Sequence, residues 1–241
     1  MSSPSKSIFH FKQFDVDQED CAMKINTDGV LLGALAEADD PATILDIGTG
    51  TGVIALMLAQ RFENAKIDAV EIDAVTAEKA GRNFANSPFA NRLTAYAGGF
   101  TDFFEANPGR KYDLIVSNPP FYIDSLISPK IKKTLTKHAD RLFFNDLIYN
   151  VLHHLTEQGV CYLVLPGNTS EEVKSITAKH NIFLQKNITI HSFKHEAYHR
   201  EIVCLGLENK TPVNEKFVIY DQPKIYSAQY QAAMVNFFTI F

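Results

Sequence analysis

The chain has 241 residues, of which 46% are hydrophobic and 21% are charged, and its formal net charge is −5. These values are typical of a globular protein with a substantial core, and they exclude the disordered, collagen-like and coiled-coil classes. No apolar run approaches the length that crosses a bilayer, and residues 1–7 lack the apolar core of a secretory signal peptide. We therefore expect a cytoplasmic protein.

The three cysteines, Cys21, Cys161 and Cys204, are odd in number and far apart. Their spacing argues against a disulfide framework and against a zinc ribbon. Cys161 and Cys204 lie within apolar runs, so we expect both thiols to be buried.

From residue 43 onward, apolar runs of strand length alternate with helical patterns. The predicted strands are 43–48, 66–72, 93–97, 112–117 and 159–165, and the predicted helices are 53–62, 74–87, 145–154 and 170–180. This alternation is typical of parallel βαβ units whose sheet is covered on both faces.

The alternation stops after residue 180. The runs 182–190 and 201–207 are joined by a connection too short for a helical crossover, so they are predicted to pair antiparallel. Residues 217–220 are a short extra strand or an extended tail, and residues 227–238 are a closing helix. The expected fold is a single α/β domain with a doubly wound, mostly parallel seven-stranded sheet whose last strand is antiparallel. Within it, residues 1–40 cap the site and residues 41–241 form the core.

A glycine-rich turn joins the first predicted strand to the first predicted helix. Its sequence from Asp46 to Gly52 is Asp-Ile-Gly-Thr-Gly-Thr-Gly, which places glycines at Gly48 and Gly50. Glycines there let a ligand approach the backbone. The spacing is neither that of dinucleotide folds nor that of phosphate loops, and no lysine follows it, which argues against ATP. Asp46 fits a cationic amino-acid group better than a pyrophosphate.

The second predicted strand ends in Val-Glu-Ile-Asp, about twenty residues after the glycines. At this position the Glu71 carboxylate can accept hydrogen bonds from both hydroxyls of a ribose, while Ile72 lies against an adenine. Asp73 is predicted to cap the helix that starts at Ala74. The turn Asp-x-Gly-x-Gly-x-Gly resembles motif I of the S-adenosylmethionine (SAM) methyltransferases, and together with Glu71 at the end of the second strand it implies SAM as the cofactor.

The fourth predicted strand runs into Asn118, Pro119, Pro120 and Phe121. In a doubly wound sheet this strand lies beside the first one at the switch point, so the two motifs should face each other. Asn-Pro-Pro-Phe resembles motif IV of methyltransferases that act on a planar amide or an exocyclic amino nitrogen. In this interpretation the Asn118 side chain and the Pro119 carbonyl accept the amino hydrogens, and Phe121 stacks on the base.

The segment 21–34, Cys-Ala-Met-Lys-Ile-Asn-Thr-Asp-Gly-Val-Leu-Leu-Gly-Ala, makes the resemblance more specific. With the two motifs and the C-terminal segment 226–238, it resembles the bacterial tRNA1(Val) adenine N6-methyltransferase family over essentially the whole chain. The resemblance implies a Rossmann-like methyltransferase fold and, as substrate, adenine 37 beside the anticodon of tRNA1(Val). It also implies that Lys24, Thr27 and Asp28 close over the methionine end of SAM. For Asp28 alone, a place in a capped helix beginning near Thr27 is an equally good interpretation.

One position departs from the related enzymes, which commonly carry Gly-Asp-Phe after the third strand. In them that acid binds the amino group of the cofactor's adenine. Here Gly99 stands in its place, before Phe100. Two groups are candidates to replace it, the Asp102 side chain and the backbone amide of Phe100.

Basic residues gather between positions 129 and 141. They are Lys130, Lys132, Lys133, Lys137 and Arg141, against the single acid Asp140. From charge alone, a solvated loop or helix face is the better interpretation. With the resemblance, the four lysines are the predicted RNA contacts, and the aromatic segment 7–14 is a second candidate RNA surface. Replacing Lys132 and Lys133 with glutamate is then predicted to abolish RNA binding and to leave SAM binding intact.

His191, His195 and His199 recur every four residues, a spacing that suits metal ligands on a helix. They fall between two predicted strands, so we expect a solvated hairpin tip and no metal. With Lys194 and Arg200, this tip is a further candidate for contact with RNA phosphate.

Three alternatives stay open at this point. A ribosomal RNA adenine or a protein glutamine also suits Asn-Pro-Pro, although glutamine methyltransferases generally carry a helical N-terminal domain that has no predicted counterpart here. The third alternative is a catalytically silent module that binds SAM or RNA, which the intact motif at Asn118 argues against. We expect a monomer.

Overall fold

The computed structural model describes residues 7–19, 21, 24–119 and 129–241, and within 129–140 it describes the backbone alone. The strands are β1 (Ile8–His10), β2 (Asp15–Asp17), β3 (Thr43–Ile47), β4 (Lys66–Glu71), β5 (Leu93–Ala97), β6 (Tyr112–Ser117), β7 (Leu155–Leu165), β8 (Phe183–Phe193), β9 (Arg200–Gly206), β10 (Val213–Gln222) and β11 (Ile225–Tyr226). The α-helices are α1 (Thr27–Leu35), α2 (Val53–Arg61), α3 (Ala74–Ala85), α4 (Phe100–Ala106), α5 (Pro129–His154), α6 (Gly167–Thr177) and α7 (Ala228–Met234). None of the helices in the described ranges is long and apolar enough to cross a membrane.

The main sheet has nine strands in the order β11-β10-β8-β9-β7-β6-β3-β4-β5. β9 runs antiparallel to β7 and β8, as predicted, and strands β3 to β7 are parallel. The seven strands β3 to β9 form the expected doubly wound core, and β10 and β11 extend it. β3 lies between β4 and β6, so the chain order reverses at the pair β3–β6, the place where such sheets bind ligands.

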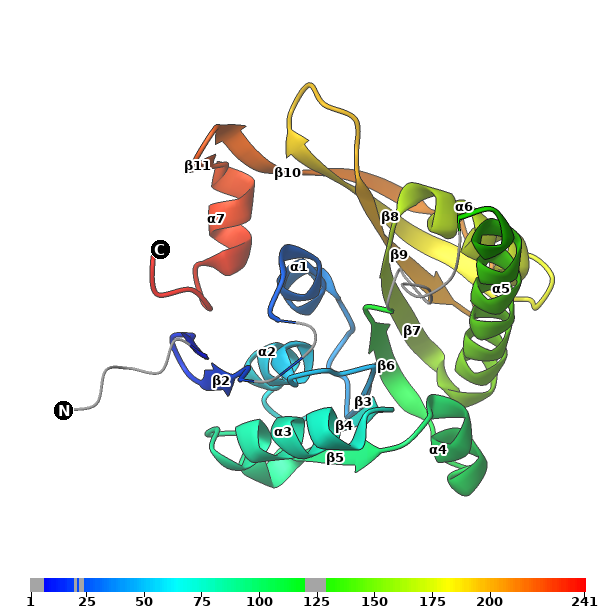
Figure 1. Cartoon of the computed structure of the whole chain (residues 1–241), viewed down its shortest axis with the longest axis horizontal. Coiled ribbons are helices and arrows are strands. Elements are labelled where there is room, and N and C mark those ends of the chain that lie inside the picture. Colours follow the sequence, from blue (N-terminus) through cyan, green and yellow to red (C-terminus); the bar gives the residue numbers. More distant parts are fainter. Residues whose placement is uncertain (1–6, 20, 22–23, 120–128) are drawn as a thin grey trace.

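Two layers of helices cover the sheet (Figure 1). Helices α1, α2, α3 and α7 pack one apolar core against the first face, and α4, α5 and α6 pack a second core against the other. β3, β6 and residues 160–165 of β7 lie in the middle of the sheet and are covered on both faces, which is why their sequences are mostly apolar. Cys161 in β7 and Cys204 in β9 are buried, as the sequence predicted.

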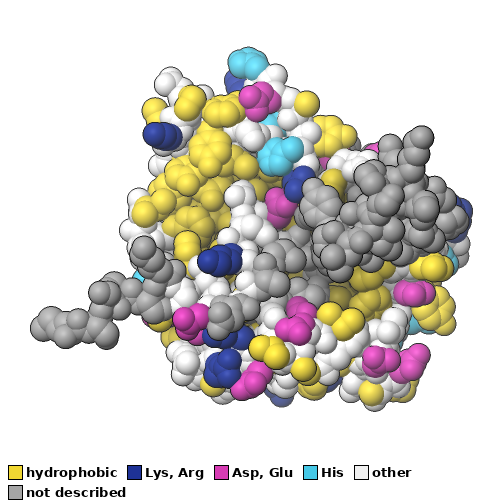
Figure 2. Space-filling view, viewed as in Figure 1, with side chains coloured by type: hydrophobic (Ala, Val, Ile, Leu, Met, Phe, Trp, Pro, Cys, Tyr) yellow, Lys and Arg dark blue, Asp and Glu magenta, His cyan; other side chains and the backbone are white. Residues whose placement is uncertain are grey.

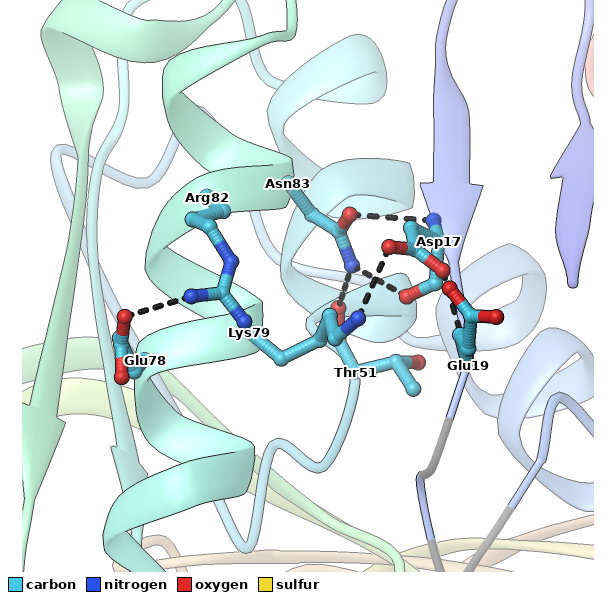
Figure 3. A network of polar contacts seen from close by, with 7 residues as sticks. All are labelled: Asp17, Glu19, Thr51, Glu78, Lys79, Arg82 and Asn83. Carbon is cyan, nitrogen blue, oxygen red and sulfur yellow. Dashed lines mark hydrogen bonds and ion pairs between the residues drawn. The ribbon is translucent and has the colours of Figure 1, made fainter.

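The N-terminal segment forms a small sheet of its own, in which β1 and β2 pair antiparallel. A buried amide holds this sheet in place (Figure 3): Asn83 of α3 donates to the Asp17 carbonyl at 3.0 Å and accepts from the Asp17 amide at 3.0 Å. The same side chain donates to the Thr51 carbonyl at 2.8 Å, and Lys79 pairs with the Asp17 carboxylate at 2.8 Å. The N-terminal segment is therefore tied to the glycine-rich turn.

In the C-terminal half of the chain, the structure corrects the expected position of one histidine and lengthens one predicted helix. His191 lies in β8 and is buried, with Nδ1 2.7 Å from the Glu196 carbonyl, so its placement at a solvated hairpin tip is wrong. His195 and His199 are exposed. The helix expected at 145–154 begins much earlier, at Pro129.

Gly52 gives a stability prediction with a matched control. Its φ is +85°, and a β-carbon there would lie 2.4 Å from a ring carbon of Phe84. Gly52→Ala is expected to lower the free energy of unfolding by about 3 kcal/mol, from left-handed strain and overpacking together. Gly81→Ala within α3, whose β-carbon would meet only Ala95 at 3.8 Å, should raise it by about 0.5 kcal/mol. Urea unfolding measures both changes in the free energy of unfolding. Equal changes in the two variants would contradict the conclusion that the fold requires glycine at position 52.

Candidate active site

A cavity of about 530 Å³ opens at the carboxyl ends of β3, β4, β5 and β6. It brings together the glycine-rich turn, the end of β4 and the start of the Asn-Pro-Pro motif, which lie far apart in the sequence. Ile47 and Ser117 pair in register at the adjoining strand ends, and the Ser117 hydroxyl donates to the Ile47 carbonyl at 2.8 Å. The predicted meeting of the two motifs at the switch point is confirmed.

The glycine-rich turn offers open backbone to this cavity. Gly48 and Gly50 have φ values of +72° and +56°, and a β-carbon built on either would meet no atom within 4 Å. The amides of Gly48 and Thr49 donate to the Val70 carbonyl at 2.8 and 3.1 Å, which fixes the turn against β4. A ligand can therefore approach this backbone closely, as the sequence predicted.

Asp46 lies behind the turn rather than in the cavity wall. Its side chain is fully buried, and one carboxyl oxygen accepts a hydrogen bond from the Thr49 hydroxyl at 2.6 Å. The sequence interpretation had placed this acid against a cationic group, whereas here it supports Thr49, which does line the cavity. Burial raises the pKa of Asp46 to about 7, against the opposing effect of the Thr49 hydrogen bond.

This raised pKa predicts a pH dependence of stability. At pH values between 3.8, the ordinary pKa of Asp, and about 7, the folded chain keeps a proton on Asp46 that the unfolded chain releases. The free energy of unfolding should therefore fall as the pH rises through this window and level off above it. Urea unfolding at several pH values checks this, and Asp46→Asn should flatten the slope. An unchanged slope in the variant would show that other groups cause it.

Glu71 connects the glycine turn to the start of α3. One carboxyl oxygen accepts from the Gly50 amide at 2.9 Å and the other accepts from the Asp73 amide at 3.0 Å. Asp73 caps α3 by accepting from the Thr76 amide at 2.8 Å, as predicted. Each Glu71 oxygen keeps a free lone pair toward the cavity. Beside it, the apolar side chain of Ile72 is 79% exposed and lines the same cavity.

The Asn118 carboxamide oxygen is buried and has no hydrogen-bond partner among the residues that the structure describes. A buried acceptor without a donor costs free energy unless a ligand supplies one. Asn118 and Pro119 line the cavity opposite the glycine turn. Pro120 and Phe121, the other members of the predicted motif, lie outside the described residues. On the side of the cavity opposite the glycine turn, this oxygen is therefore an acceptor that is ready to receive an N–H donor.

Comparison with known proteins identifies this arrangement. The model of the methyltransferase small domain matches residues 25–168. A Pedobacter heparinus protein named tRNA1(Val) (adenine(37)-N6)-methyltransferase is 41% identical over 236 residues, covering 98% of this chain and all of that protein. A protein of the same name from Christiangramia forsetii is 37% identical, and the aligned region covers 97% of this chain and 98% of that protein. The chain belongs to the tRNA1(Val) (adenine(37)-N6)-methyltransferase family.

As a member of this family, the chain is a SAM-dependent methyltransferase. Its Rossmann-like fold is shared with a predicted O-methyltransferase of Agrobacterium tumefaciens, at a TM-score of 0.66 and 17% identity, covering 87% of this chain and 95% of that one. That likeness concerns the fold alone. The cavity suits SAM because it combines open glycine backbone, a carboxylate beside the turn and an exposed apolar side chain at Ile72.

Among the described residues, the part of the cavity wall that follows β5 contains no acidic side chain. Gly98, Gly99, Phe100 and Thr101 line it, and a β-carbon at Gly99 would lie 3.1 Å from an oxygen of Asp102. The Asp102 carboxylate thus sits beside the place where related enzymes carry their acid. Phe143 of α5 closes this end, with its ring edge-on to Phe100 at 5.5 Å. Sequence reasoning missed Phe143, whose only signal is that it is an aromatic residue next to the buried Phe144.

The segment before α1 forms the outer wall. Lys24, Ile25, Asn26 and Gly29 line the cavity, and Asn26 caps α1 by accepting from the Gly29 amide at 2.9 Å. Thr27 and Asp28, which were predicted to close over the cofactor together with Lys24, do not line the cavity. Thr27 faces a neighbouring hollow. Asp28 forms an ion pair with Arg200 at 2.8 Å, which ties α1 to the start of β9.

The predicted RNA contacts can be placed only by their backbone. Lys130, Lys132, Lys133 and Lys137 belong to the first turns of α5, and their side chains lie outside the described residues. Within the described part of the chain, no group of three or more His, Cys, Asp or Glu side chains is arranged to hold a metal ion.

Proposed function

We propose that this enzyme transfers a methyl group from SAM to the exocyclic N6 of adenine 37 in tRNA1(Val), as a cytoplasmic monomer. The observation that carries the proposal is the unsatisfied Asn118 oxygen in the wall of the cavity. The names of relatives that align over nearly the full chain support the choice of substrate. The chemistry at Asn118 supports an amino group as the acceptor.

An adenine amino nitrogen is a weak nucleophile because its lone pair is delocalised into the ring. When bound, SAM supplies an electrophilic methyl group. The Asn118 oxygen and the Pro119 carbonyl accept the two amino hydrogens, which localises the lone pair and stabilises the positive charge that grows on nitrogen. Pro119 itself has no amide hydrogen to compete for these acceptors. Positioning and fixed dipoles would therefore perform the transfer without an ionised base. As the new C–N bond forms, the bond between the methyl group and sulfur would break, S-adenosylhomocysteine would leave, and the surplus proton on N6 would pass to water.

For the cofactor, we propose that Gly48 and Gly50 hold the methionine end and that Asp46 supports this turn through Thr49. Glu71 accepts from the ribose hydroxyls, and Ile72 and Phe100 hold the adenine ring. Lys24 lines the cavity and belongs to residues 1–40, the segment that closes over the site, whereas Thr27 faces the neighbouring hollow. The contacts of Gly50 and Asp73 with Glu71 support this assignment, because they leave the carboxylate fixed beside the turn.

The test is methyl transfer from labelled SAM to unmodified total tRNA, followed by nucleoside mass analysis. N6-methyladenosine that maps to position 37 of tRNA1(Val) is the expected product, and Asn118→Ala should abolish it. Transfer to ribosomal RNA or to a protein glutamine, with none to tRNA, would overturn the substrate. SAM binding without any transfer would indicate a silent binding module.

The lysines of α5 give a separate prediction for RNA binding. The double variant Lys132→Glu and Lys133→Glu should weaken tRNA binding at least a hundredfold and reduce its salt dependence, because two phosphate contacts become repulsive. Fluorescence anisotropy at several salt concentrations measures this, and SAM affinity should not change. Lys66→Glu with Lys111→Glu is the matched control, since these exposed lysines lie at the amino ends of β4 and β6, away from the site. Equal losses in both double variants would contradict the proposed contacts.

A further inference from the structure

A second hollow of about 360 Å³ lies beside the cofactor cavity. Rings from both ends of the chain line it: Phe9 of β1, Tyr226 of β11, Tyr230 of α7 and Phe238. We call it the aromatic hollow. Figure 2 shows hydrophobic side chains gathered on the surface over α7 and β11, the elements that form one of its walls.

The two ends of the chain are held together at this place. Phe11 and Phe238 form an antiparallel bridge, and the Lys12 amide donates to the Phe237 carbonyl at 2.8 Å. The Lys12 ammonium donates to the carbonyls of Val235 and Phe241 at 2.6 and 2.7 Å. The hollow is therefore built by contacts that fix its walls.

The rings that line the hollow form two contacting pairs. Tyr226 stacks on Tyr230 with centroids 4.6 Å apart, and Phe9 contacts Phe238 at 5.7 Å with the two rings tilted by 56°. Polar groups of His10, Asn26 and Thr239 stand among them. Flat apolar faces with hydrogen-bonding groups at their edges are what an unstacked nucleobase requires.

The aromatic hollow adjoins the catalytic cavity. Ile25 and Asn26 line both spaces, so a single short segment separates them. None of the described residues that line the aromatic hollow is acidic. Lys24, which precedes Ile25, lines the catalytic cavity. A polyanion whose target adenine enters the cavity would therefore pass over this segment without meeting a carboxylate in the wall of the hollow.

We infer that the aromatic hollow binds a nucleobase of the RNA next to the target adenine, held by stacking on its rings. This inference rests on the proposed function, since it supplies the second base site for the same single-stranded substrate. It also explains why both ends of the chain build one surface. A base captured here would hold the loop open while the adenine reaches Asn118.

The test compares two charge changes on neighbouring exposed apolar residues. Ile240, 67% exposed, lines the hollow, whereas Val235, 42% exposed, does not. The probe is a fluorescein-labelled RNA stem-loop with the anticodon-loop sequence of tRNA1(Val). Ile240→Glu should raise the dissociation constant about tenfold, the effect of losing one stacked base, and Val235→Glu less than twofold. Both variants should keep the SAM affinity of the unaltered enzyme.

A second variant reports stacking directly. Phe9→Leu keeps an apolar side chain and removes the ring. With 2-aminopurine placed beside the target adenine, binding to the unaltered enzyme should quench its fluorescence by stacking, and Phe9→Leu should lose most of that quenching.

Unchanged RNA affinity in Ile240→Glu, with methyl transfer to tRNA intact, would overturn this inference and leave the proposed function standing. A change of oligomeric state in Ile240→Glu without a change in RNA affinity would assign the hollow to self-association. Failure of the unaltered enzyme to bind RNA would overturn both proposals.

Discussion

Asn118→Ala should slow methyl transfer about a thousandfold while SAM affinity stays within twofold. The side chain contributes one of two acceptors for the amino hydrogens, and loss of one preorganised partner of the reacting group typically costs a factor of a hundred to a thousand. Among the described residues its oxygen has no hydrogen-bond partner, so the substitution removes no hydrogen bond described there and should not destabilise the fold. Single-turnover transfer to tRNA, with SAM affinity from calorimetry, separates the two effects.

Two further variants sharpen this result. Asn118→Asp keeps an acceptor oxygen at the same place and should retain part of the rate. Asn86→Ala, at the exposed end of α3, should behave as the unaltered enzyme. A rate for Asn118→Ala within tenfold of the unaltered enzyme would rule out the proposed role, and a parallel loss of SAM affinity would place Asn118 in the cofactor site instead.

Glu71→Ala should weaken SAM binding at least a hundredfold, or about 3 kcal/mol. The variant loses the acceptor for the Gly50 and Asp73 amides as well as the proposed contacts with the ribose. Hydrogen bonds to a charged group are each worth about 1.5–3 kcal/mol, so the loss of several explains the size of the effect. Calorimetric titration with SAM measures it directly.

The control is Glu78→Ala on α3. Glu78 pairs with Arg82 on the exposed face of the helix and does not line the cavity, so its removal tests the loss of a surface carboxylate alone. SAM affinity should then be unchanged. A Glu71→Ala enzyme that still binds SAM within tenfold would show that the carboxylate only shapes the turn.

The region from β3 to β6 could be predicted closely from the sequence because its signals are local. Buried parallel strands are continuously apolar, and the glycines of the turn are required by their positive φ values. The same holds for Asp73, whose side chain caps the helix that follows it. These features depend on neighbours only a few residues away.

The features that were missed depend on contacts that the sequence pattern does not indicate, and some of these contacts join distant parts of the chain. β2 is Asp-Val-Asp, a sequence without strand character, and it is held by Asn83 and Lys79 of α3. α4 spans seven residues and has no side-chain cap at Gly99. Asp46 was expected in the cavity, but its place behind the turn follows from the Thr49 hydrogen bond, which residue spacing does not indicate. Likewise, the aromatic hollow exists only because the two ends of the chain pair with each other.

The positions of the three thiols make this enzyme convenient to label. Cys161 and Cys204 are buried in the sheet, and burial raises the pKa of Cys204 to about 11, so neither reacts readily with maleimides at neutral pH. Cys21, which is partly exposed, lies in the segment between β2 and α1. A fluorophore attached to native protein should therefore report on this segment alone, and its emission could follow cofactor and RNA binding in real time without any engineered cysteine.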